Sequence, residues 1–217
     1  MKSEIELIVS DVDGTAVKYN NKPFYSSWDA LADVLSKEQK KEWFSTRDEY
    51  LLKGNGFYRE WFFKQVSSLR GVPVSDVEQI LFPIPYTKGF REFFETLIGV
   101  KTALLSAGVD IVAKKIVDDV GFNYLVVQNI GVENGFFNGK GIPFRDGLDK
   151  SGELLKLCEV ARVSLDKVCY VGDTFSDISC LDLVGCPVAF EPKGELIDYV
   201  REKNIHSIKD FLELTKF

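Results

Sequence analysis

Short apolar runs rich in β-branched residues alternate with helical patterns along most of this chain, and this alternation restricts the fold more than any other feature. The strand-like runs lie at residues 5–10, 100–106, 124–128 and 167–172, with a weaker one at 187–190. Helical spacing of apolar residues fills the intervals at 110–120, 151–161 and 178–184. Because strands that alternate with helices of this length form βαβ units, the sequence predicts an α/β fold with a doubly wound, Rossmann-like, mostly parallel sheet.

One long segment interrupts the alternation after the first strand-like run. It contains consecutive helical patterns at 26–36, 36–54, 57–71 and 75–81. We therefore expect two domains. A core domain would comprise residues 1–16 and 86–217, and a small helical cap domain, residues 17–85, would be inserted after the first strand.

Local signals mark where some of these elements begin and turn. Ser36 with Gln39, and Ser75 with Glu78, have the spacing of capping boxes at helix starts. The segment 132–142 contains the dipeptide Asn-Gly twice, which predicts a β-hairpin.

The inserted segment is rich in aromatic residues. It holds all three tryptophans, Trp28, Trp43 and Trp61, and the run FYREWFF at 57–63. Aromatic side chains at helical spacing are typical of a core, but they would also suit a lid over a pocket or the contact of a homodimer. The sequence leaves these three alternatives open.

The composition excludes several classes of function. The formal charge of −6 and the pI of about 5.0 argue against a nucleic-acid or anionic-membrane partner. No run reaches the roughly 20 apolar residues of a membrane span, and the acidic N-terminus is unlike a signal peptide, so we expect a cytoplasmic protein. The only histidine is His206 and the four cysteines form no CxxC pair, which excludes His-rich zinc sites and disfavours a Ser-His-Asp triad.

Two pairs of aspartates follow strand-like runs directly. Asp11 and Asp13 lie in DVDGT after the first run, and Asp173 and Asp177 lie in GDTFSD after the run at 167–172. Ligands of open α/β sheets bind at the carboxyl ends of the strands, so these side chains would converge if the two strands are neighbours. Two carboxylates about 4 Å apart repel by roughly 4 kcal/mol at an effective dielectric near 20. Such a cluster favours a bound cation, and its all-oxygen ligands favour Mg²⁺.

Two further positions suit an anionic ligand. Ser106 ends the run at 100–106, where its hydroxyl and the backbone N–H groups of Ala107 and Gly108 could hold an anion at a helix start. Lys150 precedes the helical pattern at 151–161, where a lysine opposes the helix dipole unless an anion is near.

The motifs DVDGT, LLSAG, GLDK and GDTFSD, in this order, resemble the haloacid dehalogenase superfamily, in particular its phosphoserine-phosphatase-like branch with a helical cap. The resemblance implies a phosphomonoester hydrolase for a small phosphorylated metabolite. Asp11 would be the nucleophile, forming an aspartyl-phosphate, and Asp13 the general acid and base. Ser106 and Lys150 would hold the phosphoryl oxygens.

The resemblance also implies a magnesium site. Asp11, the backbone carbonyl of Asp13 and Asp173 would bind Mg²⁺, and Asp177 would act directly or through water. Three alternatives share parts of this pattern: a phosphomutase or phosphotransferase of the same superfamily, a receiver-like phosphorelay module, and a binding protein without turnover.

The cap departs from phosphoserine phosphatases, whose caps resemble one another in a glutamate and an arginine that grip the amino acid. Alignment places these two positions near Ser26 and Phe63. Arg47 or Arg59 could replace the arginine, but the sequence shows no acidic partner. We therefore expect a substrate other than phosphoserine, with a less polar alcohol or a cationic head group against Trp28, Trp61 and Phe63.

Overall fold

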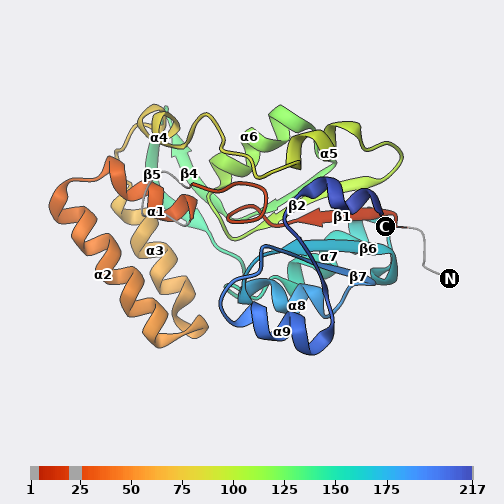
Figure 1. The fold of residues 1–217 in the computed structure, drawn as a ribbon. Coiled ribbons are helices and arrows are strands. Elements are labelled where there is room, and N and C mark those ends of the chain that lie inside the picture. Colours follow the sequence, from red (N-terminus) through yellow and green to blue (C-terminus); the bar gives the residue numbers. More distant parts are fainter. Residues whose placement is uncertain (1–4, 20–25, 217) are drawn as a thin grey trace.

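The computed structural model describes residues 5–19 and 26–216, and its centre is one parallel six-stranded sheet (Figure 1). The strand order is β3-β2-β1-β6-β7-β8, and every neighbouring pair runs parallel. This confirms the prediction of a doubly wound α/β fold, although the last strand was not expected. The strands are β1 (Leu7–Ser10), β2 (Lys101–Ser106), β3 (Tyr124–Val127), β6 (Val168–Gly172), β7 (Cys186–Phe190) and β8 (His206–Ile208).

Helices cover both faces of the sheet because its strands are apolar on both sides. In β1, Ile8 faces one hydrophobic cluster, while Leu7 and Val9 face another. The first cluster lies under α5 (Phe90–Thr96) and α6 (Asp110–Val120). The second lies under α7 (Ser151–Ala161), α8 (Ile178–Leu181) and α9 (Glu195–Lys203).

The described residues of the inserted segment form four α-helices beside the sheet (Figure 1). The capping box of Ser36 and Gln39 is present at the start of the second of them. The box predicted for Ser75 and Glu78 is wrong, because the fourth helix begins earlier, with Pro73 as its N-cap. The four are α1 (Ser27–Leu31), α2 (Lys37–Lys53), α3 (Tyr58–Ser68) and α4 (Val74–Leu81).

The predicted hairpin is present as β4 (Asn129–Glu133) and β5 (Phe136–Ile142). Asn134 and Gly135 both have positive φ values, 52° and 82°, as a two-residue turn of this kind requires. The hairpin pairs with the inserted helices rather than with the large sheet. Phe137 exchanges backbone hydrogen bonds with the segment after α3, donating to Val72 and accepting from Gly71.

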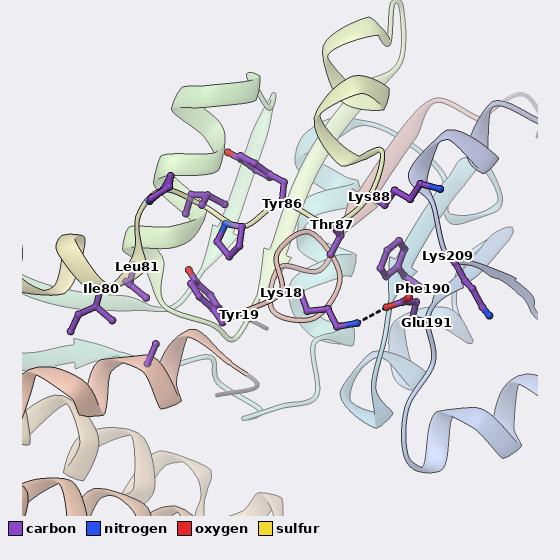
Figure 2. Close-up of a pocket in the computed structure, with 14 residues that line it drawn as sticks. Lys18, Tyr19, Ile80, Leu81, Tyr86, Thr87, Lys88, Phe190, Glu191 and Lys209 are labelled. Atoms are coloured by element: carbon purple, nitrogen blue, oxygen red, sulfur yellow. Dashed lines mark hydrogen bonds and ion pairs between the residues drawn. The ribbon is translucent and has the colours of Figure 1, made fainter. Parts of the chain in front are cut away.

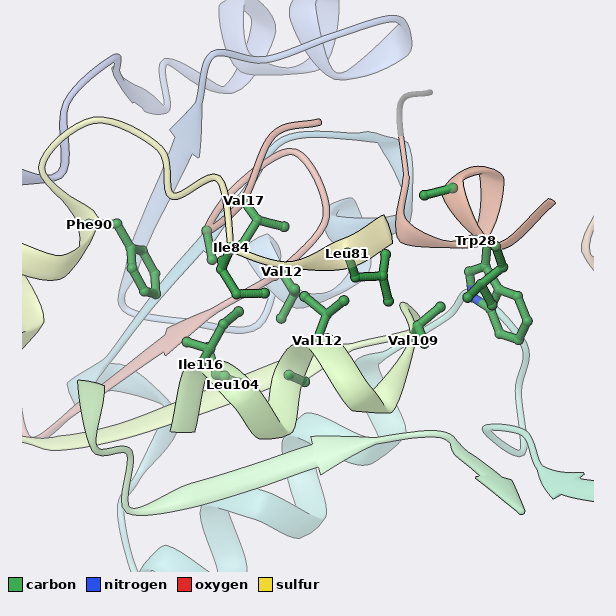
Figure 3. Close-up of a cluster of buried hydrophobic side chains, with 14 of the residues drawn as sticks. Val12, Val17, Trp28, Leu81, Ile84, Phe90, Leu104, Val109, Val112 and Ile116 are labelled. Atoms are coloured by element: carbon green, nitrogen blue, oxygen red, sulfur yellow. The ribbon is translucent and has the colours of Figure 1, made fainter. Parts of the chain in front are cut away.

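One buried cluster continues from the sheet into the inserted helices (Figure 3). Val12, after β1, and Val109, before α6, pack in it together with Leu81 and Ile84 from the end of the insert. Trp28 of α1 extends the same cluster. This packing seats the insert over the carboxyl end of β1. The division at residues 17 and 85 stays a prediction.

The three tryptophans of the insert are buried and pack on one another. The ring of Trp28 lies 5.3 Å from that of Trp61 and 6.2 Å from that of Trp43, measured between centroids. All three tryptophans therefore contribute to the buried core of the insert. Within the part of the chain that the structure describes, no helix combines the length and apolar character needed to cross a bilayer.

Candidate active site

Parallel pairing of β1 with β6 brings the two aspartate motifs together. Ser10 lies opposite Val171, and the backbone N–H of Asp11 donates to the carbonyl of Val171 over 2.9 Å. The next residues of both strands therefore emerge at one edge. Carboxylate oxygens of Asp11, Asp173 and Asp177 lie within 4.8 Å of one another, and all three residues are buried.

Lys150 supplies a positive charge to this cluster. Its Nζ lies 2.9 Å from Oδ1 of Asp11 and 2.6 Å from Oδ1 of Asp177, and its side chain is only 2% exposed. Burial alone would lower the pKa of Lys150, but the two carboxylates outweigh it and raise the pKa above its ordinary value. Lys150 is therefore a fixed cation.

The carboxylate of Asp177 already accepts hydrogen bonds at both of its oxygens. Oδ1 accepts from Lys150 and from the hydroxyl of Tyr170, and Oδ2 accepts from the backbone N–H groups of Asp173 and Thr174, each over 3.0 Å. A Cβ at Gly172 would lie 2.3 Å from Cγ of Asp177, so only glycine lets this side chain fold back so closely. These contacts make Asp177 the anchor of Lys150.

Asp13 points away from that cluster, toward the inserted helices. Its carboxylate accepts from the backbone N–H of Ser27 over 2.9 Å and from the Ser27 hydroxyl over 2.7 Å. Burial raises the pKa of Asp13 to about 6, while the two Ser27 bonds oppose the shift. Burial likewise raises the pKa of Asp11 above its usual range, against the pull of Lys150. A carboxyl with a pKa near 6 exchanges protons readily near neutral pH.

Asp173 is held by two partners from distant parts of the chain. Lys193 Nζ lies 2.8 Å from Oδ2 of Asp173, and the Thr15 hydroxyl donates to Oδ1 over 3.2 Å. The carbonyl of Thr15 in turn accepts from the hydroxyl of Thr87. Both Thr15 and Asp173 are completely buried.

The loop after β2 faces Asp13. The backbone N–H of Gly108 donates to Oγ of Ser106 over 3.1 Å, and both residues are buried. A Cβ at Gly108 would lie 2.6 Å from Oδ2 of Asp13, so the loop reaches this position only with glycine. A hydroxyl and a backbone N–H thus lie beside the acidic groups, which is an arrangement that can bind an anion.

A cavity of about 330 Å³ opens over these groups, between the sheet and the insert. Its floor includes Asp11, Asp13, Lys150 and the loop 106–108. The insert supplies four aromatic side chains and one ion pair to its wall. These residues are Trp28, Tyr50, Tyr58, Trp61, Asp29 and Arg47.

The insert therefore gives Arg47 an acidic partner that sequence reasoning missed. Arg47 Nη1 lies 3.0 Å from Oδ1 of Asp29. Ser26, near which the sequence comparison placed the glutamate of phosphoserine phosphatases, accepts from the backbone N–H of Asp29 as the N-cap of α1. Phe63 is 44% exposed and lies outside the cavity wall, with the guanidinium of Arg59 over its ring.

A second cavity of about 670 Å³ lies where the segment after β1 meets residues 83–88 (Figure 2). An ion pair between Lys18 and Glu191, 2.8 Å long, is part of its lining. The lining includes none of the clustered aspartates, so the chemistry described above belongs to the smaller cavity.

The structure brings together the residues that the sequence singled out. Asp11, Lys150, Asp173 and Asp177 form one charged cluster, and Asp13 with the loop 106–108 borders it. Their catalytic and metal-binding roles stay predictions. Sequence reasoning missed the partners that come from elsewhere in the chain. These are Thr15, Ser27, Asp29, Tyr170 and Lys193.

The sequence of this chain matches a known protein family. Residues 8–182 match the sequence profile of the haloacid dehalogenase-like hydrolases. A phosphoserine phosphatase of Methanocaldococcus jannaschii is 27% identical over 225 residues, covering 100% of this chain and 99% of that protein. One of Lactococcus lactis is 26% identical, with 95% of each chain covered. The chain spans 61% of the length of another relative, a phosphoserine phosphatase of Archaeoglobus fulgidus that is 26% identical.

Solved structures of phosphoserine phosphatases are also similar to this chain. A structure described as a phospho-aspartyl intermediate analogue of phosphoserine phosphatase has a TM-score of 0.75 and 27% identity, with 98% of both chains covered. A substrate-bound phosphoserine phosphatase also has a TM-score of 0.75, with 28% identity and the same coverage.

Proposed function

This chain belongs to the haloacid dehalogenase-like hydrolase family and is a phosphatase, and we propose that it hydrolyses small phosphate monoesters through an aspartyl-phosphate on Asp11. The observation that carries the proposal is the buried contact of Asp11 with Lys150 at the floor of a cavity that also holds Asp13. Phosphoryl transfer needs a nucleophile, a fixed cation and a group that carries a proton, and these three groups lie next to one another here.

In the proposed reaction a carboxylate oxygen of Asp11 attacks phosphorus, and the bond from phosphorus to the alcohol oxygen breaks. Asp13 gives its proton to the departing alkoxide. A water then loses a proton to Asp13 and attacks phosphorus, and the bond to Asp11 breaks to release orthophosphate. The raised pKa of Asp13 suits a carboxyl that must carry a proton in both directions, and the two bonds from Ser27 hold its carboxylate in place.

Lys150, the Ser106 hydroxyl and the N–H of Gly108 would hold the phosphoryl oxygens. All three groups line the cavity floor next to Asp11 and Asp13. Lys150 is held in place by Asp177, which frees it from the need to reorganise during the reaction.

The acidic cluster fits a magnesium ion. Its donors are buried carboxylate oxygens within 4.8 Å of one another, which is the ligand type that Mg²⁺ prefers. We propose Asp11, Asp173 and the backbone carbonyl of Asp13 as ligands. Asp177, whose two oxygens already accept hydrogen bonds, would act through water. The ion would neutralise charge on the phosphoryl group during transfer.

Magnesium-dependent release of phosphate tests the proposal. The purified protein is expected to release p-nitrophenol and orthophosphate in equal amounts from p-nitrophenyl phosphate with Mg²⁺ present. EDTA should abolish release, and excess Mg²⁺ should restore it. Unchanged release in EDTA would contradict the magnesium site. Absence of release from every phosphate monoester would contradict the function, and less orthophosphate than p-nitrophenol would favour a phosphotransferase.

We further propose that phosphoserine is not the preferred substrate. The cavity wall is largely aromatic, and its two charged residues, Asp29 and Arg47, already pair with each other. Such a wall suits a less polar alcohol or a cationic head group held against the ring faces.

A substrate panel tests this second proposal. Amino-alcohol phosphates or esters of less polar alcohols are expected to give a higher kcat/KM than phosphoserine, with sugar and nucleotide phosphates as further arms. If Arg47 and Asp29 instead gripped an amino acid, phosphoserine would rank first and Arg47→Met would raise its KM. That outcome would overturn the proposal.

A further inference from the structure

The carbonyl of Ala107, in the loop after β2, accepts hydrogen bonds from two side chains. Trp28 Nε1, from α1 of the insert, donates over 3.0 Å. The amide of Gln128, in the connection between β3 and β4, also donates to this carbonyl. Gln128 and Trp28 are 1% and 6% exposed. A carbonyl at the edge of a ligand cavity is thus bound from both the insert and the sheet.

A third residue fixes the orientation of the Gln128 amide. The hydroxyl of Tyr58, on α3, donates to Oε1 of Gln128 over 2.7 Å, and Tyr58 is 1% exposed. Because the carbonyl oxygen of Ala107 can only accept hydrogen bonds, the NH₂ group of Gln128 must face it, and the Gln128 oxygen must face Tyr58. The insert therefore reaches the carbonyl of Ala107 twice, directly through Trp28 and indirectly through Tyr58.

The bonds to Ala107 set the direction of the next N–H group. A trans peptide is planar, so its C=O and its N–H point in opposite directions. Holding the carbonyl of Ala107 toward Trp28 and Gln128 turns the N–H of Gly108 the other way. That N–H donates to Oγ of Ser106, beside the carboxylate of Asp13.

We propose that Trp28 and Gln128 are positioning residues, which hold the Ala107–Gly108 peptide so that the N–H of Gly108 faces the phosphoryl group. This inference rests on the proposed function, which places the phosphoryl group at Ser106 and Gly108. It gives the insert a task besides selecting the alcohol, because a donor on α1 completes the anion site on the sheet. A preset donor binds more tightly than one that must reorient.

The tryptophan pair offers a matched test. Trp28→Phe keeps an aromatic ring but removes the N–H that binds Ala107. Trp61→Phe makes the same change in the neighbouring ring of the same cavity wall, whose N–H is buried and has no hydrogen-bond partner among the described residues. The readout is the Kd of inorganic phosphate by calorimetry at saturating Mg²⁺.

We expect Trp28→Phe to raise the phosphate Kd on the order of tenfold. This is the effect of weakening one hydrogen bond to a charged ligand, here the bond from the N–H of Gly108 to phosphate. Trp61→Phe should change it less than about twofold. The Kd of Mg²⁺ measured without phosphate, and the thermal midpoint, should differ little between the two variants. Equal phosphate affinity in the two variants would overturn the inference.

A second pair keeps the test decisive if Trp28→Phe does not fold. Gln128→Met removes the other donor, while Gln65→Met removes a buried amide that binds the carbonyl of Trp43 inside the insert. Only Gln128→Met should weaken phosphate binding, and equal effects would overturn the inference. If the unsubstituted protein binds no phosphate in Mg²⁺, the proposed function fails and this inference with it.

Discussion

Asp11→Asn should lower kcat for phosphate release on the order of 10⁴-fold or more, because an amide oxygen is a poor nucleophile toward phosphorus. The substitution keeps the size of the side chain and leaves Lys150 paired with Asp177. The fold should therefore persist. Initial rates of phosphate release from p-nitrophenyl phosphate measure the effect, and intact mass after a rapid acid quench should show the phosphorylated enzyme only in the unsubstituted protein.

Asp119→Asn is the matched control for this experiment. Asp119 lies on α6 and accepts from the Tyr86 hydroxyl over 2.9 Å and from Lys115, away from the cavity. Its replacement should leave kcat within about twofold. An Asp11→Asn protein that keeps most of its activity would show that Asp11 is not the nucleophile.

Lys150→Met should produce the largest loss of stability among single substitutions at the site. Lys150 is 2% exposed and neutralises the buried carboxylates of Asp11 and Asp177. Breaking a buried ion pair by removing one partner costs about 3–5 kcal/mol, because the remaining charge stays buried. Urea denaturation in EDTA should show this decrease in the free energy of unfolding. Added Mg²⁺ should narrow the difference, because a cation beside Asp11 restores part of the lost attraction.

Lys156→Met provides the comparison on the same helix. Lys156 pairs with Glu153 on α7, but its side chain is 62% exposed. Exposed pairs contribute about 0–1 kcal/mol, so this variant should unfold almost as the unsubstituted protein does. If Lys150→Met lost no more stability than Lys156→Met, the cluster would not depend on Lys150 for its charge balance.

The convergence of the aspartate motifs followed from sequence because it needs only local signals. Each motif comes directly after an apolar run, and the ends of parallel neighbours meet at one edge of a sheet. The pairing of β1 with β6 was the one assumption, and the register of Ser10 with Val171 confirms it. The hairpin followed in the same way from the turn preference of Asn134 and Gly135.

Local sequence signals could not predict which side chains from distant elements contact the site residues. Ser27 meets Asp13, and Asp29 meets Arg47, only through the angle at which α1 docks on the loop after β1 and on α2. That angle depends on packing among Trp28, Trp61 and their neighbours rather than on any periodicity. The failed capping box at Ser75 has a local cause, because Pro73 takes the N-cap position with φ at −62° and starts the helix two residues earlier.

The pairing of the hairpin with the insert also bears on how the two parts can move. Residues 71–74 and the hairpin share backbone hydrogen bonds between Gly71 and Phe137, Phe137 and Val72, and Val74 and Gly135. Each hydrogen bond contributes about 0.5–1.5 kcal/mol to stability, so separating the hairpin from the inserted helices costs free energy. The hairpin thus adds an attachment between the insert and the core, besides the contacts of Ser27 and Trp28 with the loops of the sheet. Any motion of the insert away from the sheet must therefore carry the hairpin with it or break these bonds, and Gln128, which binds the carbonyl of Ala107, lies in the connection from β3 to the hairpin.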